Sequence, residues 1–235
     1  MRVYVYCFYL LVLWCIDSLG VQCDNDTQTE HDLHKRLFQT YNSNTMPCHA
    51  TSLDPFNVSI ELYLMSIDEI NELRQTISIM AFLEITWKDR FLVWDPLEYS
   101  NITSINVKVN DIWYLDVVLE STLDKHTYLV DEAGNANIKS DGSVVMWPYT
   151  DSCKIFIAQF PFDKQTRLFD FLSWTNPSSK LVLSSASTEI TRSVYKENSE
   201  WALKRGQVIF ELRPYGNDTC DHVIFSYSAN PCSSS

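Results

Sequence analysis

The feature that most constrains the fold is a two-residue alternation of apolar and polar side chains that recurs along the chain. The alternation runs through residues 58–67, 76–87 and 153–160, and turn residues separate these stretches. A period of two places every second side chain on the same face of a β-strand. About ten such strands predict an antiparallel β-sandwich.

One segment has a different period. Within residues 28–42, Leu33, Leu37 and Tyr41 recur at helical spacing, and acidic residues precede them. This pattern predicts one short amphipathic helix ahead of the strands. Short turns rather than a linker separate the remaining stretches, so we expect one all-β domain with an N-terminal helix.

The N-terminus has the layout of a secretory signal peptide. Arg2 precedes an apolar run from Val3 to Ile16, and small residues follow up to Gly20. The apolar run of about 14 residues is shorter than the ~20 that a membrane helix needs, and no later stretch approaches that length. We therefore expect residues 1–20 to be removed, leaving a secreted, extracellular domain over 21–235 with no membrane insertion.

Two further features agree with secretion. The tripeptide Asn-x-Ser/Thr, the acceptor for N-glycosylation, occurs four times, at Asn25, Asn57, Asn101 and Asn217. The formal net charge of -12 argues against nucleic acid as a partner, because phosphate binding depends on clustered Lys and Arg. An acidic balance favours solubility and, weakly, cationic ligands.

The mature chain has an odd number of cysteines. Cys7 and Cys15 would leave with the signal peptide, and five would remain: Cys23, Cys48, Cys153, Cys220 and Cys232. An odd number in an oxidising compartment implies a free thiol, a mixed disulfide or a bond between chains. The connectivity stays open, although one extended strand would hold Cys220 and Cys232 too far apart to pair.

Four motifs in order resemble those of one protein family. They are the Trp-Lys-Asp-Arg-Phe-Leu-Val-Trp-Asp-Pro stretch from Trp87, the Ile-Trp-Tyr-Leu-Asp-Val-Val-Leu stretch from Ile112, Cys153 with Phe-Pro-Phe-Asp at 160–163, and Trp174 in Leu-Ser-Trp-Thr. Together they resemble the extracellular ligand-binding domain of Cys-loop receptors, which are pentameric ligand-gated ion channels, and in particular the soluble acetylcholine-binding proteins. The resemblance covers essentially the whole mature chain.

The resemblance implies a pentameric homo-oligomer with a small-molecule site between neighbouring subunits. In this family an amine cation is held among aromatic ring faces, where each ring contributes roughly 0.5–2 kcal/mol. The positions that match the principal face are Trp174, Glu120 and Tyr215, and those that match the complementary face are Phe82, Trp147 and Val145. The other tryptophans, Trp87, Trp94, Trp113 and Trp201, are interpreted as core residues.

Several positions depart from the family pattern. Glu120 replaces a tyrosine of the principal face, and Leu212 and Cys220 stand where two more tyrosines are expected. The segment from Arg213 to Cys220 has no adjacent cysteine pair, and Arg167 stands where the disulfide partner of Cys153 is expected. The resemblance therefore predicts a diverged member with an altered ligand preference.

The leading hypothesis is a secreted protein that binds an amine or another small organic ligand. The alternatives are a structural subunit that assembles without binding a ligand, the extracellular part of a channel subunit, and a lectin-like protein. We expect no enzyme, no cofactor and no metal site, because no catalytic motif occurs and the histidines lack metal-ligand spacing (His31, His34, His49, His126 and His222).

Overall fold

The computed structural model describes residues 28–48, 54–71, 76–120, 134–156, 165–197, 201–203 and 206–231. Several predictions fall outside these ranges: the signal peptide over 1–20, the glycan site at Asn25, and the Phe-Pro-Phe-Asp motif at 160–163. Cys23 and Cys232, the first and last cysteines of the predicted mature chain, also lie outside the described residues.

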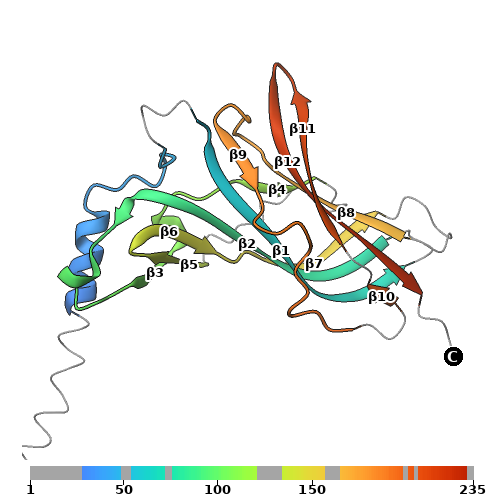
Figure 1. The fold of residues 1–235 in the computed structure, drawn as a ribbon, viewed down its shortest axis with the longest axis horizontal. Helices are drawn as coiled ribbons and strands as arrows, with labels where there is room; N and C mark the ends of the chain where they lie inside the picture. The colour runs from blue at the N-terminus through green and yellow to red at the C-terminus, as the bar shows by residue number, and fades with distance from the viewer. Residues whose placement is uncertain are drawn as a thin grey trace, which may run out of the picture.

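The described residues form twelve strands in two sheets (Figure 1). The seven-stranded sheet consists of β1 (Phe56–Asn71), β2 (Thr76–Val93), β3 (Ser104–Lys108), β5 (Asn135–Lys139), β6 (Asp141–Met146), β7 (Tyr149–Phe156) and β9 (Leu181–Ser184). The five-stranded sheet consists of β4 (Val117–Leu119), β8 (Gln165–Ser173), β10 (Trp201–Leu203), β11 (Gln207–Tyr215) and β12 (Asp218–Pro231). Two short 3₁₀ helices, Pro96–Glu98 and Val109–Asp111, lie in the connections.

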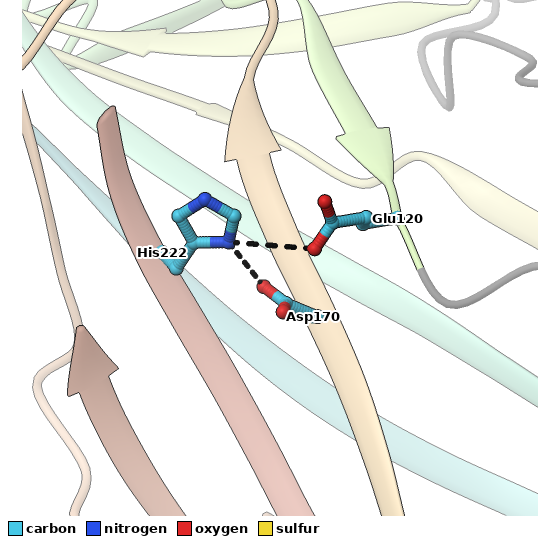
Figure 2. Close-up of side chains that lie close together, drawn as sticks. All are labelled: Glu120, Asp170 and His222. Atoms are coloured by element: carbon cyan, nitrogen blue, oxygen red, sulfur yellow. Dashed lines mark hydrogen bonds and ion pairs between the residues drawn. The ribbon is translucent and has the colours of Figure 1, made fainter. Parts of the chain in front are cut away.

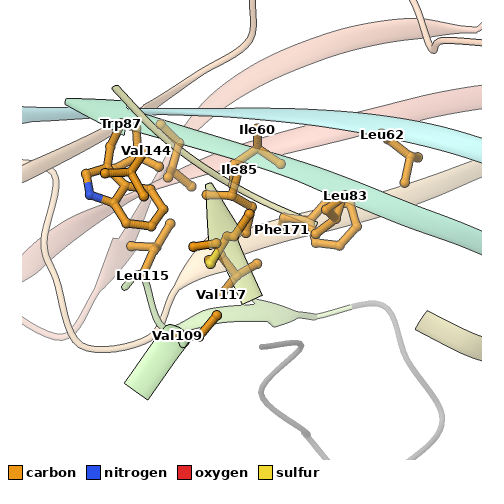
Figure 3. Close-up of a cluster of buried hydrophobic side chains, with 14 of the residues drawn as sticks. Ile60, Leu62, Leu83, Ile85, Trp87, Val109, Leu115, Val117, Val144 and Phe171 are labelled. Atoms are coloured by element: carbon orange, nitrogen blue, oxygen red, sulfur yellow. The ribbon is translucent and has the colours of Figure 1, made fainter. Parts of the chain in front are cut away.

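The two sheets enclose one hydrophobic core (Figure 3). The inward side chains of β1 and β2, such as Ile60, Leu83 and Ile85, are fully buried. Phe171 of β8 and Val117 of β4 meet them from the other sheet. Each fully buried aliphatic or aromatic side chain contributes about 1.5–3 kcal/mol to folding. The apolar residues of the period-two pattern in the sequence are the side chains that form this core.

The antiparallel register of β1 and β2 places their alternate side chains on the same two faces. Tyr63 lies opposite Phe82 and Glu61 lies opposite Glu84, and these four side chains point away from the core. The outward face of the seven-stranded sheet therefore carries aromatic and acidic groups together.

The N-terminal helix spans residues 28–38, and Leu33 and Leu37 are the side chains that it buries. Tyr41 follows the helix rather than belonging to it, but it packs against the core as expected. Its hydroxyl donates a hydrogen bond of 2.5 Å to Asp89 Oδ2 and accepts one of 3.1 Å from the backbone N–H of Trp113. These two bonds join the N-terminal segment to the sandwich.

The structure confirms the all-β sandwich with a short N-terminal helix and corrects three details. It has twelve described strands rather than about ten, because short pieces such as β4 and β10 carry too few residues to show a period. The helix ends at residue 38 rather than 42. One pairing, β1 with β9, is parallel, whereas the predicted sandwich was antiparallel throughout.

Three of the four tryptophans interpreted as core residues are buried. Trp87, Trp94 and Trp113 are 3%, 4% and 9% exposed, and the rings of Trp87 and Trp113 meet edge to face at 5.7 Å. The side chain of Trp201 lies outside the described part. For the described tryptophans, the interpretation as core residues is confirmed.

The described glycan acceptors Asn57, Asn101 and Asn217 are exposed, as modification requires. Cys48 is exposed and Cys220 is buried, and neither forms a disulfide with a described cysteine. No described helix is both long enough and apolar enough to cross a membrane.

Candidate ligand-binding site

Two aromatic residues of the predicted principal face lie against each other. Trp174 follows β8 directly, and Tyr215 is the last residue of β11. Their ring centroids are 6.1 Å apart, with an interplanar angle of 59°. Both side chains remain accessible, at 42% and 56% exposure. We call Trp174 and Tyr215 the aromatic pair.

Asp116 holds the segment that carries Trp174. Its carboxylate accepts hydrogen bonds from Ser173 Oγ at 2.6 Å and from the backbone N–H of Thr175 at 2.7 Å. Asn176 Nδ2 donates to the same carboxylate at 3.3 Å, and the N–H of Trp174 donates to the Asp116 carbonyl at 3.3 Å. The aspartate of the sequence motif therefore anchors the segment that carries Trp174.

Next along the same sheet lies an ionic cluster of Glu120, Asp170, Arg213 and His222 (Figure 2 shows all but Arg213). These residues come from four places in the chain: the end of β4, β8, β11 and β12. Asp170 points outward because its neighbours Phe169 and Phe171 face the core. The cluster therefore covers the outer face of the five-stranded sheet.

Short contacts connect the members of the ionic cluster. Asp170 Oδ1 lies 2.7 Å from His222 Nδ1, and Glu120 Oε2 lies 3.8 Å from the same nitrogen. Arg213 Nη1 bridges the two carboxylates, at 2.6 Å from Asp170 and 2.9 Å from Glu120. Arg213 also donates to Glu211 from Nε and Nη2, at 3.0 and 2.9 Å.

Charge and burial set the protonation states around this cluster. Desolvation lowers the pKa of Arg213, but its bonds to Glu211 and Asp170 outweigh this effect and leave that pKa raised. The guanidinium is therefore a permanent cation. Burial, followed by the charges of Asp218 and Asp221, raises the pKa of the Cys220 thiol, so this buried cysteine stays protonated and unreactive.

The residues predicted for the complementary face lie on the outward face of the other sheet. Phe82 stacks on Tyr63 with centroids 4.7 Å apart and an interplanar angle of 6°. Val145 lies on β6 opposite Thr86 of β2. Trp147 is 48% exposed, and its indole N–H donates to Glu84 Oε2 at 3.0 Å. One surface thus carries three aromatic groups, an aliphatic group and a carboxylate.

The structure places the six predicted residues in two sets, on different sheets. Trp174 and Tyr215 touch, and Glu120 reaches them through Arg213, which is two residues from Tyr215 on β11. Phe82, Val145 and Trp147 belong to the other sheet. Since the two outward faces of a sandwich point away from each other, one chain presents two separate surfaces.

Sequence reasoning missed several residues of these surfaces. Asp170, His222, Tyr63 and Glu84 belong to no local motif, although period two does place Tyr63 and Glu84 on the polar face of their strands. Asp170 and His222 are 52 positions apart and meet only when β8 pairs with β12. Of the two positions expected to be tyrosines, Leu212 is 67% exposed and Cys220 is buried.

Comparison with known sequences tests the family directly. Residues 30–227 match the family described as neurotransmitter-gated ion-channel ligand binding domain. The chain belongs to this family. This ligand-binding-domain family is not an enzyme family, and its match covers both surfaces described above.

Among curated proteins, similar chains are subunits of acetylcholine receptors. The acetylcholine receptor subunit alpha-type acr-16 of Caenorhabditis elegans is 37% identical over 180 residues, which cover 74% of this chain and 35% of the relative. The neuronal acetylcholine receptor subunit alpha-2 of Rattus norvegicus is 31% identical over 219 residues, covering 91% of this chain and 42% of the relative. The chain thus spans less than half the length of these curated relatives.

Proposed function

We propose that this neurotransmitter-gated ion-channel ligand binding domain acts as a secreted protein that binds a small organic ligand, such as an amine, between subunits of a pentamer. The observation that carries the proposal is the accessible aromatic pair, Trp174 and Tyr215, held in place by Asp116. Exposing the apolar surface of an aromatic ring to water is unfavourable, and the face of the ring attracts cations. Acetylcholine receptor subunits are among the curated relatives, which supports an amine as the ligand.

The two outward surfaces support a site between subunits. The aromatic pair supplies one wall, and Phe82 with Trp147 on the other sheet would supply the opposite wall from a neighbouring copy. Acidic groups accompany both surfaces, Glu120 on one and Glu84 on the other. A cationic ligand would therefore meet aromatic faces and negative charge on each side.

The test is to replace Trp174 and titrate amines. Trp174→Ala should weaken binding of acetylcholine, nicotine or simple primary amines by over about 1 kcal/mol, roughly fivefold, because one cation–π contact is lost. Isothermal titration calorimetry measures the affinity without depending on the fluorescence of Trp174. The matched control is Leu97→Ala, which removes an 80% exposed apolar side chain that belongs to neither surface.

Oligomeric mass provides a second, independent test. Light scattering on the secreted protein should give about five times the mass of one chain. A monomer would remove the site between subunits, and an affinity unchanged in Trp174→Ala would refute the assigned wall.

A second candidate function is a structural subunit that assembles without a ligand, and one observation favours it. The guanidinium of Arg213 lies among Glu120 and Asp170, two residues from Tyr215, so the chain's own cation already neutralises part of the negative charge there. A pentamer that binds none of the amines would support this alternative over the first.

A further inference from the structure

We propose that Glu120, Asp170 and His222 form a binding site for a divalent transition-metal ion of the zinc class, with Arg213 as the competing internal cation. The three side chains converge from β4, β8 and β12, and one ligand atom of each lies within 4.8 Å of the other two. The metal site shares Glu120 with the proposed ligand wall, but it does not require an organic ligand.

The distances suit a metal after small side-chain rotations. Zinc binds nitrogen and oxygen ligands at about 2.0–2.2 Å in a tetrahedral arrangement, so its ligand atoms are roughly 3.3 Å apart. His222 Nδ1 lies 2.7 Å from Asp170 Oδ1 and 3.8 Å from Glu120 Oε2. The first separation is shorter and the second is longer than the tetrahedral value, so metal binding requires both pairs to adjust; Glu120 is the mobile member because its side chain is 50% exposed.

The ligand types select a borderline metal rather than calcium or magnesium. Two carboxylates and one imidazole supply nitrogen and oxygen ligands that zinc accepts, in the number that leaves a fourth position for water. Calcium and magnesium prefer oxygen-only sites. His222 and Asp170 are 4% and 6% exposed, so two ligands are fixed in the sheet, while Glu120 faces solvent and leaves a route of entry.

The charge balance leaves room for a dication. Glu120, Asp170 and Glu211 supply three carboxylates around the single guanidinium of Arg213. The three carboxylates and the one guanidinium sum to a formal charge of -2. A divalent cation would neutralise this charge, whereas removing a partner from a buried carboxylate is costly.

Arg213 marks the position of the cation. Its Nη1 lies 2.6 Å from Asp170 Oδ2 and 2.9 Å from Glu120 Oε2, between the two carboxylates that would bind the metal. If a metal displaces it, the guanidinium keeps its two bonds to Glu211 and moves toward solvent, since its side chain is already 38% exposed. Metal binding therefore leaves no unpaired buried charge.

The experiment titrates zinc chloride into the full-length secreted protein, stripped of metal, by isothermal titration calorimetry. We expect one ion per chain. His222→Gln should weaken binding by at least about tenfold, because it removes the nitrogen ligand. Arg213→Gln should strengthen binding by about tenfold, because it removes the competing cation. If the cluster were only an internal network of ion pairs, removing Arg213 would not increase the affinity for zinc.

Control variants separate this site from other zinc ligands. The double variant His31→Gln with His34→Gln removes the two histidines of the N-terminal helix and should leave the affinity unchanged. Cys220→Ser tests the thiol on the strand paired with Arg213. Glu120→Gln, at an exposed position, should weaken binding and provides a second test if His222→Gln does not fold.

Three outcomes would overturn the proposal. One is the absence of zinc binding in both the natural protein and Arg213→Gln. Another is full binding in both His222→Gln and Glu120→Gln. The third is loss of binding in the helix double variant or in Cys220→Ser, which would assign the ion to those side chains. Cobalt substitution adds a direct check, since a thiolate ligand produces an intense near-ultraviolet band that oxygen and imidazole ligands lack.

Discussion

At the scale of single residues, Asp89 shows how burial and hydrogen bonding oppose each other. Its carboxyl is fully buried, and it accepts hydrogen bonds from the Tyr41 hydroxyl at 2.5 Å and from the backbone N–H of Phe91 at 2.9 Å. Burial raises the pKa of Asp89, and these bonds, with the charge of Arg90, offset only part of the increase. The folded protein therefore holds this proton more tightly than the unfolded chain does.

This shift predicts a pH dependence of stability. Because the folded pKa of Asp89 lies above its ordinary value of 3.8, the folded state binds more protons in the interval above that value. The stability that the group contributes is complete below pH 3.8 and is lost as the pH rises through the folded pKa. Asp89→Asn does not titrate, so its free energy of unfolding should lack this decline.

The measurement compares urea unfolding of the natural protein and Asp89→Asn at several values between about pH 4 and pH 7. Other carboxylates contribute equally to both proteins and cancel in the difference. The natural protein should lose stability relative to the variant as the pH rises. A difference that grows in the opposite direction would contradict the raised pKa.

At the scale of elements, the hairpin of β5 and β6 depends on one glycine. Gly142 adopts a φ of +82°, and a Cβ there would lie 2.5 Å from the Asp89 carbonyl oxygen and 2.9 Å from Val93 Cγ2. The close approach lets β6 pair with β2 from Ile85 to Val93. Val145 and Trp147, which end this hairpin, are positioned by that pairing.

Gly142→Ala should therefore lower the free energy of unfolding by more than about 2 kcal/mol, since backbone strain and a steric clash add together. Gly216→Ala provides a matched control. Gly216 has a φ of +63° but nothing within 4 Å of its added Cβ, so only strain of about 1 kcal/mol applies. Chemical denaturation of both variants measures the difference, and equal losses would show that the close approach to Asp89 is unimportant.

The hairpin of β11 and β12 carries several of the departures from the family pattern. It extends beyond the body of the sandwich (Figure 1), and Phe210, Leu212 and Tyr215 on it are more than half exposed, at 51%, 67% and 56%. Leu212 and Cys220 stand where two tyrosines are expected, and the segment from Arg213 to Cys220 has no adjacent cysteine pair. The same strand pair supplies His222 to the proposed metal site and Arg213 as the competing cation.

At the scale of the whole molecule, the two walls of the proposed ligand site occupy different outward faces. A complete site then needs two chains, and this requirement can be tested by mixing variants. Trp174→Ala removes the wall formed by the aromatic pair, and Trp147→Ala removes the opposite wall. Each variant alone should bind amines poorly.

Co-expression of these two variants in equal amounts should restore binding at about one quarter of the interfaces, because such an interface joins two intact walls. Calorimetric stoichiometry on the mixed oligomer measures the fraction. The control mixes Trp174→Ala with Tyr215→Ala, in which every interface has a damaged wall, so no binding should return. Binding restored equally in both mixtures would exclude a site shared between chains.

The sequence by itself determined the class of fold, the N-terminal helix and the family. Apolar and polar side chains alternate over many residues in β1 and β2. Because one face of each strand is buried, the apolar positions of this pattern are the core residues. Asp116 and Trp174 could be found because each lies in a short sequence motif of its own, Asp116 in the stretch from Ile112 and Trp174 in Leu-Ser-Trp-Thr. Trp174 and Tyr215 were found in this way, and so was the departure at Glu120.

Only the tertiary structure decided which side chains these residues contact. Whether Glu120 faces solvent or the site could not be derived from its place after β4, because its partners Asp170, Arg213 and His222 come from strands paired at long range. Contacts between distant strands depend on register, and register depends on the burial of the whole core rather than on any local pattern. For this reason the two residues of the aromatic pair could be predicted from the sequence, whereas the ionic cluster beside them could not.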